Sequence, residues 1–293
     1  MSWQNVFRRD LRSTFRSRLG PAAVLVLLLS TVGVAGLVVF TADPRYPPDM
    51  EGMVVVFGSI QSFLLPLVAL MATYSAVVSE RTTGSIRFLL GLPNSRADAY
   101  VGKFCSRALV VVAPTVVGLL VAGAILTPVV QNGSFVFFAQ LAALSTVYAL
   151  LFLGVGLTAS VVADTDTRAV AYVVGAFALL RAGWPAAQWA GLQSLETPVP
   201  KPGWYFWVGR ANPMNAYVKL TTELYPVDSH PLITTPRTLP DNGGRFGYTV
   251  DFARESAAGT FPVSGEFAAV ALVALALVAP VAGFLHFRRR DVL

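Results

Sequence analysis

The sequence contains few charged residues, one cysteine and two histidines. Only 13% of its 293 residues are charged, whereas soluble globular domains carry about 25%. Such a low share argues against a soluble protein, and the 55% of hydrophobic residues argues against a disordered chain. One cysteine excludes an internal disulfide framework and a Cys-rich zinc module, and two histidines leave little for a His-based metal site. These absences indicate a membrane protein.

Six apolar segments are long enough to cross a bilayer, whose hydrocarbon core needs about 20 residues of helix. They are residues 21–41, 54–79, 106–127, 135–162, 169–190 and 266–287. For the first segment the alternative is a cleaved signal peptide. Its apolar run is longer than the usual stretch of about 7–15 residues, and it ends in FTADPRY rather than in a small-residue cleavage site. The sequence therefore predicts an all-α, polytopic membrane protein with six transmembrane helices.

These spans divide the chain into four parts. Residues 1–20 form a cytoplasmic interfacial helix, and residues 21–190 hold transmembrane helices 1–5 with a cytoplasmic loop at 80–105. Residues 191–265 form an extracytoplasmic segment, and residues 266–293 form the sixth helix and a basic tail. Fourteen Lys and Arg residues lie on the side of the two termini and seven on the other side. The positive-inside rule therefore predicts a multi-pass protein of the cytoplasmic (plasma) membrane with both termini in the cytoplasm.

The N-terminal segment is amphipathic when drawn as a helix. One half of the helical wheel carries the apolar side chains of Trp3, Val6, Phe7, Leu11 and Phe15, and the other half carries Arg8, Arg9, Arg12 and Arg16. Helices with this division lie in the membrane interface, so we expect Trp3, Phe7 and Phe15 to contact it. The alternative is a plain basic flank that only sets the topology.

The loop between the second and third spans carries helix signals. Apolar residues at helical spacing predict a short helix from about residue 82 to 90, which Gly91 and Pro93 end. Ser95 and Asp98 have the spacing of a capping box, so a second helix begins there and continues into the third span. This arrangement holds a compact apolar knob outside the membrane, where a partner can push on it. The alternative is an ordinary loop whose leucines lie on the membrane surface.

The same loop carries Glu80, Gly84, Leu89, Leu90, Pro93, Ser95, Arg96, Gly102 and Lys103. In this order the residues resemble the loop between spans two and three of type 2 ABC exporter permeases. The amphipathic N-terminal helix, the six spans and the long outer segment fit the same family. Gly91 departs from the pattern, because members of the family often carry serine before the Leu-Pro pair.

The resemblance implies a permease subunit that exports its substrate with ATP hydrolysed by a separate ATPase subunit, and that pairs with a second copy or a homologous sibling. The loop would be the coupling helix on which the ATPase docks. The residues at that contact would be Glu80, Arg81, Thr83, Gly84, Arg87, Leu89, Leu90 and Pro93. Asp164, Asp166 and Arg168 match, by position only, the second cytoplasmic contact of the family. Two aspartates alone are too few ligands for calcium, so without the resemblance they indicate a solvated turn.

The sequence offers no nucleotide site, catalytic group, metal site or bound cofactor. A P-loop requires Gly-x4-Gly-Lys-Ser/Thr, but Phe104 follows Gly102–Lys103, and Ala97 stands where the first glycine is needed. If ATP drives the protein, the partner subunit binds it. The chain is therefore expected to be no enzyme itself, with the lipid bilayer and other protein subunits as its partners and no role in binding nucleic acid.

The interiors of the six spans contain no Asp, Glu or Lys. Proton-coupled carriers usually place such groups at membrane depth, so their absence argues against that class. Arg181 is the one charged residue away from the span ends, and we favour a side chain that reaches the outer interface over one that lines an internal path. Trp204 and Trp207 are predicted to lie at the same interface.

The outer segment, residues 191–265, holds nine of the nineteen prolines and therefore is not one long helix. Asn212 as N-cap and Pro213 as first residue predict a helix over residues 213–225. The segment is a surface lid, a shield over an exit or a binding surface for a partner. It also motivates the alternative that the chain is a non-transporting membrane scaffold that anchors an extracytoplasmic assembly. Nothing in the spans selects a substrate, although their apolar walls favour an amphipathic or lipid-like one.

Overall fold

A computed structural model describes residues 3–84, 95–194, 203–225 and 265–289. In these ranges six helical stretches are long and apolar enough to cross a membrane, which confirms the predicted all-α, polytopic fold. They are Leu19–Thr41, Met50–Thr82, Arg96–Leu126, Phe135–Val162, Asp166–Gly191 and Gly265–Arg289.

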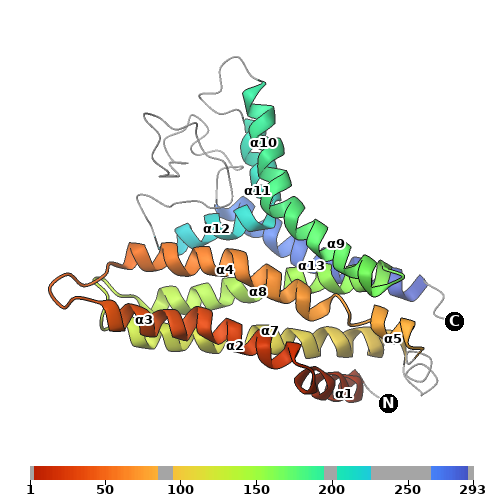
Figure 1. Ribbon diagram of the computed structural model, residues 1–293. Coiled ribbons are helices and arrows are strands. Elements are labelled where there is room, and N and C mark those ends of the chain that lie inside the picture. Colours follow the sequence, from red (N-terminus) through yellow and green to blue (C-terminus); the bar gives the residue numbers. More distant parts are fainter. Residues whose placement is uncertain (1–2, 85–94, 195–202, 226–264, 290–293) are drawn as a thin grey trace.

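The individual helices follow the spans closely (Figure 1). The N-terminal helix α1 covers Trp3–Arg16, and the first span consists of α2 (Leu19–Leu28), the π-helix η1 (Leu29–Gly33) and α3 (Val34–Thr41). The second span is α4 (Met50–Thr73) followed by α5 (Val78–Thr82), the third is α7 (Arg96–Leu126) and the fourth is α8 (Phe135–Val162). The fifth combines α9 (Asp166–Ala178), the π-helix η2 (Leu179–Gly183) and α10 (Trp184–Gln193). The outer helices α11 (Gly203–Ala211) and α12 (Pro213–Leu224) precede the last span, α13 (Gly265–Arg289).

Helix α8 forms the centre of the bundle and packs against α4, α7 and α13 (Figure 1). Two glycines allow this close packing. A Cβ atom at Gly154 would lie 2.6 Å from Cδ of Pro280 in α13, and one at Gly156 would collide with Oγ1 of Thr73 in α4. Larger residues at these two positions would therefore force the spans apart.

The first, fifth and sixth spans are the least buried. Only 22% of the most apolar part of the first and of the sixth span and 17% of that of the fifth is buried, against 56% for the second and fourth. Their exposed faces carry large apolar side chains such as Leu37 and Val174. These faces therefore contact lipid or another protein subunit, because exposing so much apolar surface to water would be unfavourable.

Helix α1, the start of α7 and the end of α13 meet at one end of the bundle (Figure 1). The backbone N–H of Trp3 donates to Oδ1 of Asp98 at 3.1 Å, and Nη1 of Arg96 donates to the carbonyl of Arg288 at 2.8 Å. Gly102 admits α1, since a Cβ atom there would lie 2.7 Å from Cβ of Val6. Both ends of the chain therefore lie on the same side of the spans.

The loop after the second span is described only as far as Gly84. Helix α5 ends at Thr82, where the short helix predicted for residues 82–90 was expected to begin, and Gly84 follows in the left-handed region with φ 71°. Residues 85–94, which include the remainder of the predicted helix, lie outside the described residues. The capping box is confirmed, because Oγ of Ser95 accepts from the N–H of Asp98 at 3.0 Å and Oδ2 of Asp98 accepts from the N–H of Ser95 at 3.1 Å.

The predicted outer helix is also confirmed. Helix α12 begins at Pro213, and the side chain of Asn212 caps it by accepting from the N–H of Met214 at 2.9 Å. Residues 226–264 of the outer segment lie outside the described residues.

Candidate functional site

A turn at residues 74–77 separates α4 from α5 in the second span. The backbone N–H groups of Val77 and Val78 donate to Oγ of Ser160 in α8, at 2.9 and 3.1 Å. The first N–H groups of a helix have no partner within it, and Ser160 supplies one inside the bundle. The hydroxyl of Ser160 therefore fixes where α5 begins.

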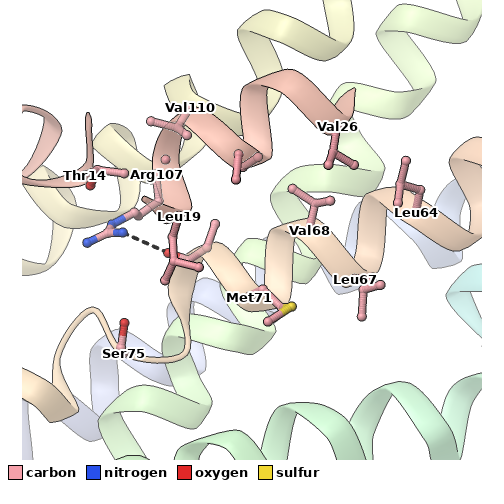
Figure 2. A pocket seen from close by; sticks show the side chains of 14 residues that line it. Thr14, Leu19, Val26, Leu64, Leu67, Val68, Met71, Ser75, Arg107 and Val110 are labelled. Carbon is pink, nitrogen blue, oxygen red and sulfur yellow. Dashed lines mark hydrogen bonds between the residues drawn. The ribbon is translucent and has the colours of Figure 1, made fainter. Parts of the chain in front are cut away.

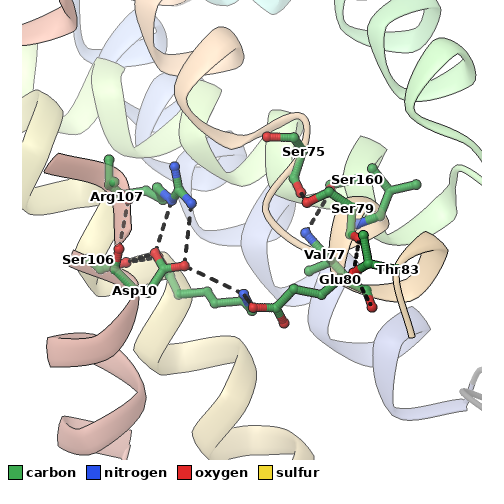
Figure 3. Close-up of polar contacts among 12 residues, drawn as sticks. Asp10, Ser75, Val77, Ser79, Glu80, Thr83, Ser106, Arg107 and Ser160 are labelled. Atoms are coloured by element: carbon green, nitrogen blue, oxygen red, sulfur yellow. Dashed lines mark hydrogen bonds and ion pairs between the residues drawn. The ribbon is translucent and has the colours of Figure 1, made fainter. Parts of the chain in front are cut away.

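Next to this turn lie four charged side chains, Asp10, Glu80, Lys103 and Arg107, which we call the buried charge cluster (Figure 3). Nζ of Lys103 lies 2.8 Å from Oε1 of Glu80 and 3.5 Å from Oδ1 of Asp10. Nε of Arg107 lies 3.0 Å from Oδ2 of Asp10. The side chains of Lys103 and Asp10 are only 4% and 8% exposed. Two carboxylates and two cations thus neutralise one another with little help from water.

Asp10 is the centre of the cluster. Burial by itself raises the pKa of its carboxyl group, but the charges of Lys103 and Arg107 and the hydrogen bonds from Ser106 and Arg107 outweigh burial. The pKa of Asp10 therefore lies below its ordinary value, and the carboxylate stays ionised at neutral pH. Arg107 also donates through Nη1 to the carbonyl of Ala72 at 3.1 Å, near the end of α4.

The cluster connects elements that are far apart in the sequence. Asp10 belongs to α1, Glu80 to α5, and Lys103 and Arg107 to α7. Removing one partner from a buried ion pair leaves an uncompensated charge and costs about 3–5 kcal/mol. The three helices therefore form one mechanical unit at the base of the loop that continues beyond Gly84.

A second set of contacts joins this loop to the loop between the fourth and fifth spans. Nη2 of Arg81 lies 3.6 Å from Oδ1 of Asp164, and Nη1 of Arg81 donates to the carbonyl of Val161 at 3.2 Å. Oδ2 of Asp164 in turn pairs with Nη1 of Arg168 at 2.7 Å. The structure thus brings Arg81 together with Asp164 and Arg168. Asp166 is exposed in the first turn of α9.

The remaining residues of the predicted docking set divide into two groups. Thr83 is exposed, and its hydroxyl donates to the carbonyl of Ser79 at 2.8 Å. Gly84 lies at the end of the described stretch. The other members, Arg87, Leu89, Leu90 and Pro93, lie outside the described residues.

The residues predicted for the membrane interface are largely exposed. Trp3 and Phe15 are 40% and 49% exposed on α1, whereas Phe7 is half-buried. Trp204 and Trp207 are exposed on α11. Arg181 lies on η2 with its guanidinium carbon 5.3 Å from the centre of the Phe63 ring of α4, so it points toward a neighbouring span.

A cavity of about 240 Å³ lies between α2 and α4 beside the cluster (Figure 2). Its walls are apolar, with Val26 of α2 and Met71 of α4 among them, and Arg107 and Thr14 lie at its polar end. The junction between α1 and α2 is therefore not packed solidly against α4.

Two residues of the site have roles that the sequence did not reveal. Asp10 follows Trp3 and Val6 at helical spacing, so it lies on the face of α1 that packs against α7. The sequence did contain one sign of this role, because Asp10 is the only acid in a helix that is otherwise rich in arginine. Lys103 carried the resemblance, but its two acidic partners come from distant parts of the chain.

Comparisons with known proteins agree with the resemblance. The model of the ABC-2 family transporter proteins matches residues 4–292 of the chain. The chain is 30% identical over 113 residues to the probable ABC transporter permease protein NosY of Pseudomonas aeruginosa, and 28% identical over 114 residues to the protein of the same name from Stutzerimonas stutzeri. Each alignment covers 39% of this chain and 41% of the relative's length.

The charge cluster predicts a clear effect of Asp10→Asn on stability. The substitution leaves Lys103 and Arg107 with fewer counter-charges in a buried position, so we expect the folded state to lose about 3 kcal/mol. Thermal unfolding of the purified chain in detergent measures the loss. Arg12→Gln changes an exposed charge on the same helix and should leave the unfolding temperature unchanged. Equal unfolding temperatures for Asp10→Asn and the wild type would contradict the role of the cluster.

Proposed function

The chain belongs to the ABC-2 family of transporter proteins, and we propose that it exports its substrate from the cytoplasm. It is a multi-pass membrane permease subunit, and its family implies work with a separate ATPase subunit. Permeases of this family typically lack an ATPase domain of their own. The proposal adds the direction of transport, the docking site, the orientation in the membrane and the pairing of two permeases.

The ATPase docks on the two loops that Arg81 and Asp164 connect. The first loop contributes Glu80, Arg81, Thr83, Gly84, Arg87, Leu89, Leu90 and Pro93, and the second contributes Asp164, Asp166 and Arg168. The ion pair between Arg81 and Asp164 supports this assignment, because it holds the loops close enough for one partner surface to reach both.

The anchoring of α5 is the observation that carries the proposal. Glu80 binds α5 to α7 through Lys103, and Ser160 binds its first N–H groups to α8. A partner that pushes on the chain after Gly84 therefore pushes on the ends of three spans at once. Closing of the ATPase dimer around nucleotide would tilt these spans and open a path for the substrate.

Two copies of the chain, or one copy and a homologous sibling, form the path. The low burial of the first, fifth and sixth spans supports this pairing, because it leaves apolar faces on which a second permease can pack. The interiors of the spans carry no carboxylate for proton coupling, which agrees with energy supplied by ATP outside the membrane.

Both termini and the docking loops face the cytoplasm, in the cytoplasmic membrane. The excess of arginine on that side supports this orientation. Residues 1–20 then form the interfacial helix and residues 21–190 hold the first five spans and the docking loop. Residues 191–265 form the extracytoplasmic segment, and residues 266–293 form the sixth span and the cytoplasmic tail.

Docking is tested by co-purification with the ATPase. The double variant Arg87→Glu, Leu89→Asp places acids where the ATPase is expected to bind, so we expect the recovered ATPase to fall at least about tenfold. The control, Arg45→Glu with Tyr46→Asp, makes similar changes in the hairpin at the opposite end of the bundle and should retain full recovery. Equal recovery with both double variants would exclude docking at this loop.

Orientation is tested by labelling with a membrane-impermeant maleimide. In a background with Cys105→Ser, the variant Tyr46→Cys should react in intact cells. The variant Thr83→Cys should react only after the membrane is permeabilised, because Thr83 is exposed on the cytoplasmic side. Labelling of Thr83→Cys in intact cells would reverse the topology.

A further inference from the structure

Arg181 lies within the fifth candidate membrane span, Asp166–Gly191. It follows the start of α9 at Asp166 by roughly 22 Å along the helix axis, at 1.5 Å per residue. The hydrocarbon core is about 30 Å thick, so we place Arg181 inside it. An ionised residue at such a depth marks a functional site unless the protein provides a partner for it.

The described residues provide no ion-pair partner for Arg181. No carboxylate among them lies within 4.0 Å of it, and its Nη1 atom is buried without a hydrogen-bond partner in that part of the chain. Its guanidinium carbon lies 5.3 Å from the centre of the Phe63 ring of α4. Aromatic groups attract the cation without neutralising it.

A second copy of the chain cannot supply the missing charge from its own spans. Their interiors contain no Asp or Glu in either copy, because the sequences are the same. Neither the described residues of one copy nor the span interiors of a second copy offer a counter-ion to Arg181, so an anionic ligand molecule can fill this position.

The fold holds Arg181 in place for such a molecule. The π-helix η2 is widened, and the side chain of Asn212 donates to the carbonyl of Leu180 at 2.7 Å, which ties η2 to the cap of α12. The ring of Phe63 also packs edge-on against Phe177 at 5.5 Å, so α4 and α9 meet here. Insertions of this kind in a helix often accompany functional sites.

The surroundings define the chemistry of the ligand. Phe63 is 43% exposed, and Leu179 and Val174 are exposed on the neighbouring span, so apolar side chains surround the open side of the site. We infer that Arg181, held beside the ring of Phe63, binds the anionic group of an amphipathic molecule whose apolar part lies along α4 and α9. The inference rests on the proposed function, because the same exposed face of the fifth span is assigned there to the pairing of two permeases that form the path.

Native mass spectrometry of the isolated chain in neutral detergent tests the inference, with phosphatidylglycerol and phosphatidylcholine as probes. The wild type should bind one phosphatidylglycerol in preference to phosphatidylcholine. Arg181→Gln removes a charged hydrogen-bond donor and should weaken the binding of phosphatidylglycerol about tenfold. Arg181→Lys keeps the cation and should retain most of the preference, and Arg45→Gln, the same change outside the membrane, should have no effect.

Unchanged lipid preference in Arg181→Gln would overturn the inference, as would the absence of any preference in the wild type. A second arm adds inorganic phosphate at the concentration of the lipid. If the lipid stays bound, the ligand is amphipathic as proposed, whereas displacement by phosphate alone would overturn that assignment in favour of a free anion. Because the assay contains no ATPase, its result is independent of whether docking occurs at the proposed loops.

Discussion

The ion pairs that Lys103 makes with Asp10 and Glu80 are the constraint on which the rest of the structure depends. Buried charges are costly unless they are paired. If α1 or α5 moved away from α7, a charge of the pair would lose its partner while still buried. Gly102, the neighbour of Lys103, lets α1 lie close enough for the pair to form. One dipeptide in α7 thus determines both the fit of α1 and its electrostatic bond.

The buried charge cluster and Arg181 serve different purposes in this permease. At the end of the bundle, the chain pairs every member of the buried charge cluster with its own residues, which gives a rigid junction suited to transmit force. In the fifth candidate membrane span, Arg181 lies against the Phe63 ring and, among the described residues, pairs with no acid. A paired charge stabilises the architecture, whereas an unpaired one at membrane depth is available to a ligand.

The local features of the fold could be predicted from the sequence, because they depend on neighbouring residues. The six spans follow from length and apolarity, the start of α7 follows from Ser95 and Asp98, and α12 follows from Asn212. The features that depend on distant residues could not be predicted. Helix α5 begins at Val78 because Ser160, more than eighty positions away, caps it, and Asp10 is buried because Lys103 and Arg107 approach from α7. The direction of Arg181 depends likewise on Phe63 of another span.

The central claim is that α1 and α5 move with α7 as one unit, and a distance between α1 and α5 tests it most directly. Spin labels at Ser13 and Thr82, both exposed, report this distance by pulsed electron paramagnetic resonance in the complex with the ATPase. The account predicts the same narrow distance distribution without nucleotide and with ATP trapped. A change in the distance between the two labels on ATP binding would contradict it.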